Sequence, residues 1–248
     1  MEQEAIPAAT LIVVRDQIGA APSLLMVERA AKMAFAGGAM VFPGGRIDPA
    51  DQVMGAAADW SDQAARIAAI RETLEETGIA VGLSPQPSPS LAIVLQDALI
   101  ASQPFAELLA THGLGLDLSA LTPFARWRPA FQHVRRFDTI FFVARAPTGD
   151  WIPRPQPGEC EAALWVGGSD VLGQIGRGEA RAIFPTLRNL ERLALFADFD
   201  AIRAHADAFP VTIITPWIEE RDGLSHICIP ADAGYPVTSE PLSSAVRA

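Results

Sequence analysis

The sequence RETLEETG, residues 71–78, carries three glutamates behind an arginine. Residues three and four positions apart on a helix are neighbours on one face, so Glu72, Glu75 and Glu76 are expected on one side of a helix. Crowded carboxylates repel one another unless a cation lies among them, and Mg²⁺ prefers oxygen ligands of this kind. Arg71 can hold Glu75, one helical turn further on, by a charge-assisted hydrogen bond. Taken alone, the stretch predicts either a divalent-cation site or a solvated acidic helix face.

The residues around this stretch predict a helix over 61–77. Ser61 suits the N-terminal cap, and Gly78 suits the position just past the C-terminal end. The apolar residues of the segment fall at i, i+3 and i+7, on one stripe that can face a core: Ile67, Ile70 and Leu74.

The rest of the chain predicts an α/β protein in which strands and helices alternate. Strands are expected at 9–14, 23–29, 79–83, 121–128, 137–146 and 160–166. Helices are expected at 103–112, capped by Ser102, and at 169–175, 186–198 and 200–208. Residues 46–60 show no clear period and predict an irregular excursion, and the short Pro/Ser-rich segment 84–90 predicts a loop. A late hairpin is expected from 211–218 and 225–229, joined through the turn at 221–223.

The composition limits the classes of partner. The chain has 248 residues, half of them hydrophobic, and a formal net charge of −10 with Lys32 as its single lysine. This length suits one large domain, or one domain with an extension. Non-specific nucleic-acid binding needs a basic surface, so we expect no nucleic-acid partner. Arginines can still hold one small phosphate ligand.

Cysteine use and hydropathy predict a cytoplasmic protein. Cys160 and Cys228 are isolated, with neither metal-ligand spacing nor a disulfide framework, so both are expected to be reduced, packed thiols. Residues 1–16 lack the pattern of a signal peptide, and no apolar run approaches the length of a membrane span. We therefore expect no membrane partner.

Gly44, Gly45 and the later segment RETLEETGI, residues 71–79, together resemble the Nudix box. That pattern reads G-x5-E-x7-R-E-U-x-E-E-x-G-U, where U is a bulky apolar residue. The second half matches at every fixed position, with Thr73 at a U site. In the first half Asp51 replaces the glutamate, and 19 residues separate it from the arginine where the pattern has 7. The chain is therefore similar to Nudix proteins with an enlarged box.

The resemblance implies a fold and a domain organisation. Nudix proteins are αβα sandwiches, so we expect a mixed central sheet between helical layers. The expected organisation is a single Nudix domain over residues 1–248. Residues 52–60 would be the core of the insertion, a loop or short helix at the rim of the site, and 199–248 a C-terminal extension packed on the domain.

The resemblance also implies a reaction: Mg²⁺- or Mn²⁺-dependent hydrolysis of a nucleoside diphosphate linked to another group. The implied metal ligands are Glu72, Glu75, Glu76 and the backbone carbonyl of Gly44, with Glu72 and Glu76 counted as catalytic. A small-molecule diphosphate is the expected partner, and a homodimer is left open. The alternatives are a catalytically silent Nudix domain that senses a nucleotide, and an interaction domain with an acidic helix.

Residues outside the box complete the expected site. Other Nudix enzymes draw a further acid from a loop, and Glu159 or Glu161 could fill that role or be a solvated loop acid. Arg135 and Arg136 precede a strand and could hold a phosphate, or Arg136 could pair with nearby Asp138. Two further substrate-binding residues are expected, Arg29 and Gly45.

Several segments resemble the acyl-CoA diphosphatase-like branch of the family: 24–51, 135–142, 159–166 and 184–193. The CoA signature L-L-T-x-R-[SA]-x3-R-x3-G-x3-F-P-G-G is matched at Leu25, Arg29, Ala30, Gly38 and 42–45. It is not matched at Val27, in place of threonine, or at Ala34, in place of the second arginine. CoA or an acyl-CoA is the expected substrate, with ADP-ribose, a nucleotide sugar or a dinucleotide as alternatives.

Apolar residues near these motifs have two interpretations. Met33, Phe35 and Met40 could line the pocket rim for a flexible arm of the substrate, or could belong to the core. Trp127 and Trp165 fall inside predicted strands and are expected in the core rather than as stacking surfaces.

Overall fold

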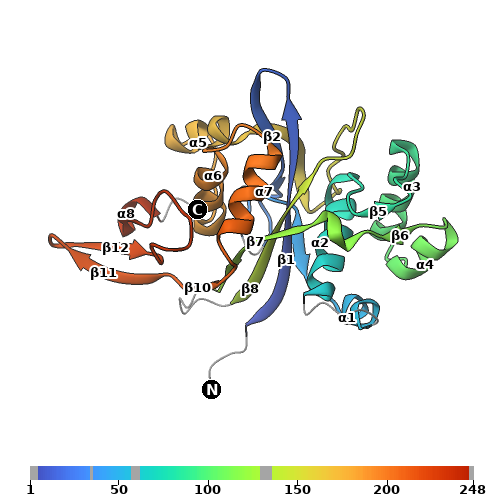
Figure 1. The fold of residues 1–248 in the computed structure, drawn as a ribbon, viewed down its shortest axis with the longest axis horizontal. Coiled ribbons are helices and arrows are strands. Elements are labelled where there is room, and N and C mark those ends of the chain that lie inside the picture. The colour runs from blue at the N-terminus through green and yellow to red at the C-terminus, as the bar shows by residue number, and fades with distance from the viewer. Residues whose placement is uncertain (1–4, 34–35, 57–61, 129–135, 246–248) are drawn as a thin grey trace.

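A computed structural model describes residues 5–33, 36–56, 62–128 and 136–245, and a mixed sheet forms its centre (Figure 1). The strand order is β10-β7-β8-β1-β2-β3, with β4 paired to β1 and β9 paired to β2. The central pair β1 and β8 is parallel, whereas β1 and β2 form an antiparallel hairpin. The strands of this sheet are β1 (Ile6–Gln17), β2 (Ala20–Arg29), β3 (Met40–Val41), β4 (Gly44–Arg46), β7 (Thr122–Trp127), β8 (Phe137–Arg145), β9 (Cys160–Gly167) and β10 (Ile213–Ile214).

Strand β1 is buried on both of its faces. Leu11 and Val13 belong to one hydrophobic cluster, whereas Ile12 and Val14 belong to the other. Alternate side chains of a strand point to opposite faces, so a continuous apolar run requires cover on both sides. The predicted strand at 9–14 is therefore confirmed as the centre of a longer strand.

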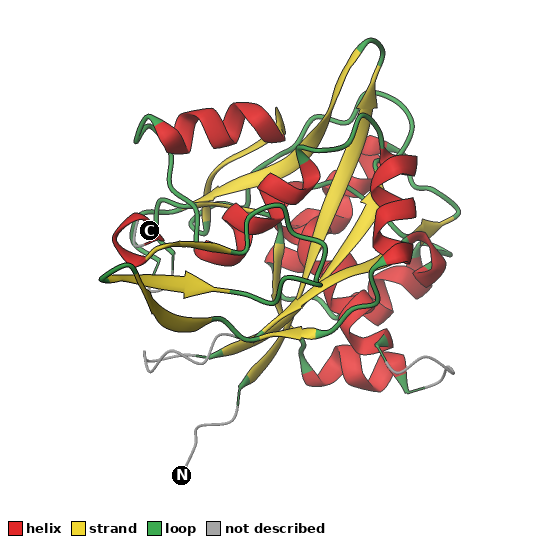
Figure 2. Ribbon diagram, turned by 60° about the vertical axis from the view of Figure 1, so that its left-hand side comes forward, coloured by secondary structure: helices red, strands yellow, loops and turns green. Residues whose placement is uncertain are grey.

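Helices supply that cover and make an αβα sandwich, as the resemblance implied (Figures 1 and 2). One face carries α1 (Pro49–Gly55), α2 (Gln63–Thr77), α3 (Pro89–Ile100) and α4 (Phe105–Thr111). The other carries α5 (Gly168–Gly176), α6 (Phe184–Leu193) and α7 (Phe199–Ala208). The predicted mixed α/β fold is confirmed.

Helix α2 is the predicted helix of the glutamate stretch, and it begins two residues later than expected. Asp62 is its N-cap residue, while Ser61 lies outside the described residues. Gly78 ends it with φ of 69°, a conformation that favours glycine, and its N–H bonds the carbonyl of Leu74 at 2.8 Å. Thr73, the polar residue at an apolar position of the box, donates its hydroxyl proton to the carbonyl of residue 69 at 2.7 Å. The substitution is therefore satisfied inside the core.

Two helices contradict the predictions of irregular structure. Within 46–60, residues 49–55 form α1, and residues 57–60 lie outside the described part. A proline at its first position suits a helix start, and this signal was missed. Helix α3 was not predicted. Ser88, inside the expected loop, caps it by accepting a hydrogen bond from the N–H of Leu91 at 3.2 Å.

Three smaller predictions are also wrong. Ser102 does not cap α4: it has φ of 63° and its N–H bonds the Leu99 carbonyl at the end of α3, so Pro104 precedes α4 instead. The segment 79–83 is buried without forming a strand, because its apolar side chains pack on the core, and only β5 (Leu83–Ser84) pairs, with β6 (Gly115–Leu116). The helix expected over 186–198 ends at Leu193.

The C-terminal segment contains the expected hairpin, β11 (Trp217–Arg221) and β12 (Leu224–Cys228). A third strand, β13 (Ser239–Pro241), extends it, and a short helix, α8 (Leu242–Ala245), follows. Strand β10 precedes the hairpin in the chain, and it joins the main sheet by pairing in parallel with β7. A 3-10 turn, η1 (Leu118–Ala120), precedes β7. The helices in the described ranges are all too short or too polar to cross a membrane.

Candidate active site

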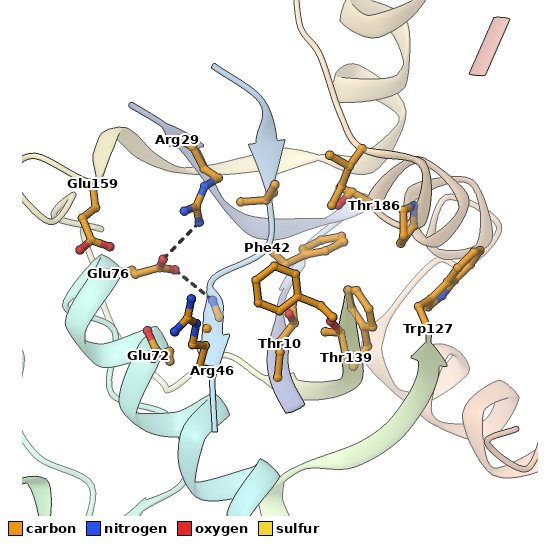
Figure 3. Close-up of a pocket in the computed structure, with 18 of the residues that line it drawn as sticks. Thr10, Arg29, Phe42, Arg46, Glu72, Glu76, Trp127, Thr139, Glu159 and Thr186 are labelled. Atoms are coloured by element: carbon orange, nitrogen blue, oxygen red, sulfur yellow. Dashed lines mark hydrogen bonds and ion pairs between the residues drawn. The ribbon is translucent and has the colours of Figure 1, made fainter. Parts of the chain in front are cut away.

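The glutamate face of α2 opens onto a cavity of about 710 Å³, within the usual range for small-molecule sites (Figure 3). At one end lie Glu72, Glu76, Glu159 and Arg29. At the other end lies a wall that includes Trp127 and Thr186. Between the two ends the cavity is lined by residues of β1, β8 and the FPGG segment: Thr10, Thr139, Phe141 and 42–45.

Glu76 is the most enclosed of the carboxylates that line the cavity, with 3% of its side chain exposed. It accepts a hydrogen bond from the N–H of Gly44 at 2.9 Å, and the guanidinium of Arg29 lies 3.9 Å away. Burial raises the pKa of Glu76 to about 8, and the Glu72 carboxylate adds to the rise, whereas the Gly44 N–H and Arg29 oppose it. Without a bound cation, the Glu76 carboxyl therefore tends to hold its proton at neutral pH.

Glu72 and Glu75 line the same end and share Arg71. The Arg71 guanidinium lies 2.8 Å from Glu72 and 3.7 Å from Glu75. The predicted hydrogen bond of Arg71 to Glu75 is not formed: these two residues are an ion pair at the longer distance, and Arg71 donates its hydrogen bond to Glu72 instead. Burial raises the pKa of Glu72 to about 7, with Arg71 opposing, and burial also raises the pKa of Glu75. Glu75 additionally accepts a hydrogen bond from the Gln156 amide at 3.2 Å.

Asp51 takes the place of the first acid of the box in spite of the added residues. It is 1% exposed and receives two hydrogen bonds from Arg71, at 3.0 Å and 2.8 Å. Burial alone would lower the pKa of Arg71, but the hydrogen bond and charge of Asp51, with the charge of Glu72, raise it. Asp51 lies in the first turn of α1, and the added residues that follow it do not prevent its contact with Arg71.

Gly44 and Gly45, at the start of the box, allow close packing against different neighbours. Gly44 has φ of 156°, and a Cβ there would lie 2.4 Å from the backbone carbonyl of Ala9. A Cβ on Gly45 would lie 2.5 Å from the carboxylate of Glu72. The sequence predicted a metal contact from the Gly44 carbonyl, and the structure shows its N–H bound to Glu76.

The carboxylate oxygens at this end of the cavity are ligands of the kind that a hard divalent cation such as Mg²⁺ prefers. Four carboxylates line one end of the cavity: Glu72, Glu75, Glu76 and Glu159. Within the described ranges, no three acidic, histidine or cysteine side chains are already gathered at metal-binding spacing. Glu72 and Glu76 instead face protein cations and an N–H. Burial is the main cause of the raised pKa values of Glu72, Glu75 and Glu76, and neighbouring carboxylates add to it. A bound cation would favour the charged forms of these carboxyls.

The structure also places the other predicted residues. Arg29 lines the cavity, and its Nε is buried with no hydrogen-bond partner among the described atoms. Arg136 lines the cavity as well, whereas Arg135 lies outside the described residues. Asp138 is held by two hydrogen bonds from Arg126, at 2.8 Å and 2.9 Å.

The two candidate loop acids differ in position. Glu159 lines the cavity, while Glu161 is exposed on β9 and does not line it. Met33 lines the cavity, as predicted for the rim, but Met40 is buried in the core, and Phe35 lies outside the described residues. In the insertion, the described residues 52–56 do not line the cavity.

Sequence reasoning missed the wall opposite the glutamates. Trp127 is 1% exposed, as expected of a core residue, yet its side chain also lines the cavity. Thr139, Ile183, Pro185 and Thr186 were not predicted. They come from β8 and from the start of α6, and no local motif marks them.

A sheet covered on both faces, with an acidic helix beside a glycine loop at one cavity, defines a hydrolase of the Nudix type. The NUDIX domain profile matches residues 5–92. A NUDIX hydrolase from Alicyclobacillus acidocaldarius is 30% identical, with a TM-score of 0.71, over 82% of this chain and 97% of that one. A MutT NUDIX hydrolase from Burkholderia pseudomallei is 18% identical, with a TM-score of 0.42, over 76% of this chain and 98% of that one.

The chain belongs to the Nudix hydrolase family. It is an enzyme that acts on pyrophosphate bonds, in a family that hydrolyses nucleoside diphosphate derivatives. Nudix hydrolases generally use divalent metals such as Mg²⁺ or Mn²⁺.

Proposed function

We propose that this enzyme is a Mg²⁺- or Mn²⁺-dependent pyrophosphohydrolase that cleaves a nucleoside diphosphate linked to another group, and that the group is CoA or an acyl-CoA. One observation carries the proposal: Glu72, Glu76 and Glu159 face the same end of a cavity large enough for such a substrate (Figure 3). Buried carboxylates that repel one another are suited to a cation and to proton transfer.

The proposed roles follow from position. When bound, a divalent cation would neutralise the diphosphate and make an attacking water more acidic. Glu72, Glu75 and Glu76 would hold that ion, and Glu159 would accept the proton of the water. Of the two loop acids, Glu159 is preferred because it lines the cavity and Glu161 does not.

Positively charged side chains are also needed to bind the phosphates of the substrate. Arg29 and Arg136 line the cavity, and each guanidinium can form charge-assisted hydrogen bonds with phosphate oxygens. The buried Nε of Arg29 has a hydrogen to donate. Gly45 has no side chain, which leaves room for the Glu72 carboxylate at the cavity.

The CoA assignment rests on the sequence signature around Arg29, Gly38 and 42–45, with Met33 at the cavity for a flexible arm. The absence of an arginine at residue 34 departs from that signature. ADP-ribose, a nucleotide sugar and a dinucleotide remain the alternative substrates. A catalytically silent nucleotide sensor is the alternative function.

The test is a product assay on CoA, an acyl-CoA, ADP-ribose, a nucleotide sugar and a dinucleotide, each with Mg²⁺, with Mn²⁺ and with excess chelator. We expect CoA to yield 4'-phosphopantetheine and an adenosine bisphosphate only when the metal is present. If CoA is inert while another compound is cleaved, the CoA assignment fails and the general assignment stands. Tight binding of a nucleotide without cleavage of any compound would favour the sensor.

A further inference from the structure

The end of the cavity opposite the glutamates has a different chemical character. Its wall includes Trp127 on β7 and Thr139, the residue paired with Trp127 on β8. Phe141 lies on the same face of β8, and Ile183 and Pro185 flank the start of α6 beside Thr186. The wall is mainly apolar, with Trp127, Phe141, Ile183 and Pro185, and the hydroxyls of Thr139 and Thr186 are polar atoms in it; Arg136 lines the cavity next to it, just before β8. In the described lining, the carboxylates come from α2, from Asp48 and from Glu159.

Trp127 is fixed on several sides. Thr139 and Ile214 flank it in the sheet. Its indole N–H donates a hydrogen bond to the hydroxyl oxygen of Tyr235 at 3.0 Å. The ring packs edge-on against Tyr235, with centroids 5.6 Å apart, and against Phe184, at 5.9 Å. An indole held by both stacking and a hydrogen bond cannot turn in its site without losing a buried contact.

Tyr235 is the single tyrosine of the chain and belongs to the C-terminal extension. Its hydroxyl donates to the side-chain oxygen of Asn189 on α6 at 2.8 Å, so it accepts one hydrogen bond and donates another. The preceding Gly234 has φ of 78°, and a Cβ there would lie 3.0 Å from the ring of Phe209. His205 contacts the Gly234 carbonyl at 3.3 Å. The extension is therefore anchored where it meets Trp127.

We infer that Tyr235 is a positioning residue that holds Trp127 as the wall of a subsite for an uncharged, apolar group of the substrate. The inference rests on the proposed function, which places the diphosphate at the glutamate end. A group attached to that diphosphate would extend along the cavity toward Trp127. Either an aliphatic arm or a nucleobase has the required apolar surface, and the experiment distinguishes them.

The test uses Tyr235→Phe, which keeps the ring and removes the hydroxyl. Three diphosphates are compared: the methyl ester of ribose 5-diphosphate, the methyl ester of ADP, and the octyl ester of ribose 5-diphosphate. The first has no large apolar group, the second has a base, and the third has an alkyl arm. We expect KM to rise about fivefold to tenfold for the base or for the alkyl compound, the scale of one lost buried hydrogen bond, with kcat within about twofold. Both parameters for the first compound should not change.

Trp127→Phe removes the N–H from the other side of the same hydrogen bond. If Tyr235 acts through Trp127, the double variant should have the KM of Trp127→Phe alone, because that variant has already lost the hydrogen bond between the two residues. The hydrogen bond to Asn189 that Tyr235→Phe also removes involves a residue that does not line the cavity. Trp165→Phe is the matched control: its N–H donates to the Trp151 carbonyl at 2.9 Å, and it does not line the cavity. This control should leave the KM of all three compounds unchanged.

The outcomes separate the inference from the function on which it rests. A KM rise with only one of the two apolar compounds identifies the group that the subsite takes. An equal rise with all three compounds, or additive effects in the double variant, would overturn the inference while the hydrolase assignment stands. If the unaltered enzyme with Mg²⁺ cleaves none of the three compounds nor any other diphosphate, the proposed function itself fails.

Discussion

The two ends of the cavity are built in different ways. The acidic groups of one end come mainly from a single helix, α2, and from segments that pack directly on it. The wall of the other end joins β7, the start of α6 and the C-terminal extension, and the hydrogen bond between Trp127 and Tyr235 spans 108 positions of the chain. Helix geometry alone orders the first end, whereas the second depends on the packing of the whole domain. Changes at the first end should therefore alter turnover, and changes at the second should alter the choice of substrate.

The largest effect is expected from Glu76→Gln. The amide keeps the size of the side chain but removes a charged oxygen ligand from the most enclosed carboxylate that lines the cavity. We expect kcat to fall by at least about a hundredfold, the scale of losing one group that stabilises the transition state. Steady-state kinetics measures this, with circular dichroism as the check of folding. Glu161→Gln, an exposed acid outside the cavity, is the matched control and should retain full turnover. Equal turnover rates in both variants would show that Glu76 has no role in catalysis.

The second-largest effect, a loss of stability, is expected from Asp51→Asn, because Asp51 holds Arg71 at the acidic end of the cavity. Asp51 is buried, and its two hydrogen bonds with Arg71 would be weakened while the arginine keeps its charge. Breaking one partner of a buried ion pair costs about 3–5 kcal/mol, and the retained amide oxygen should keep the loss near 3 kcal/mol. Urea unfolding measures the change in free energy of unfolding. Asp48→Asn is the control, because Asp48 is more exposed and lies 3.6 Å from Arg71. A loss below about 1 kcal/mol would mean that the insertion does not anchor Arg71.

Smaller effects on turnover and stability are expected from substitutions at the adjacent glycines, Gly44 and Gly45. In Gly45→Ala the new methyl group meets the flexible carboxylate of Glu72, so we expect kcat to fall about tenfold with less than about 1 kcal/mol of lost stability. In Gly44→Ala the methyl group meets the backbone of β1, so stability should fall by more. Kinetics and urea unfolding on both variants test this. The reverse pattern would contradict the assigned contacts.

Much of the fold could be predicted from the sequence, because its signals are local. The continuous run of branched apolar residues marked β1, and the i, i+3, i+7 stripe marked α2. The missed helix α3 has apolar residues around most of its circumference, and the Pro/Ser segment before it concealed its cap at Ser88. For the segment 79–83 a strand was predicted and is not formed, since burial of apolar residues does not require strand pairing.

The candidate site divides in the same way. Helical spacing was enough to bring Glu72 and Glu76 to one face. The contact of Trp127 with Tyr235 could not be predicted, because no spacing rule relates residues so far apart in sequence. Trp127 also shows that a residue can be almost completely buried and still line a ligand cavity, since exposure to bulk solvent and contact with a cavity are different properties.

The smallest effect concerns a second group of carboxylates, where the extension meets α6. The buried guanidinium of Arg188 lies 2.9 Å from Glu191 and 3.4 Å from Glu240 on β13. Burial raises the pKa of Glu191 to about 7, Arg188 opposes the rise, and the charge of Glu240 adds to it. Unlike the glutamates of α2, this pair does not line the cavity.

A carboxyl whose folded-state pKa lies above its unfolded value stabilises the fold below the unfolded pKa, and this contribution is lost as pH rises through the folded value. For Glu191 the stability should therefore decline between about pH 4.5 and pH 7. Glu191→Gln cannot ionise, so its free energy of unfolding should decline less over the same range, by about 1 kcal/mol. Urea unfolding at several pH values in the presence of chelator measures this, and Glu161→Gln, an exposed acid, should follow the unaltered protein. If the two glutamine variants show the same pH dependence, Glu191 keeps its charge throughout. In that case Arg188 compensates both carboxylates, and the attachment of the extension, unlike the acidic end of the cavity, is electrostatically balanced.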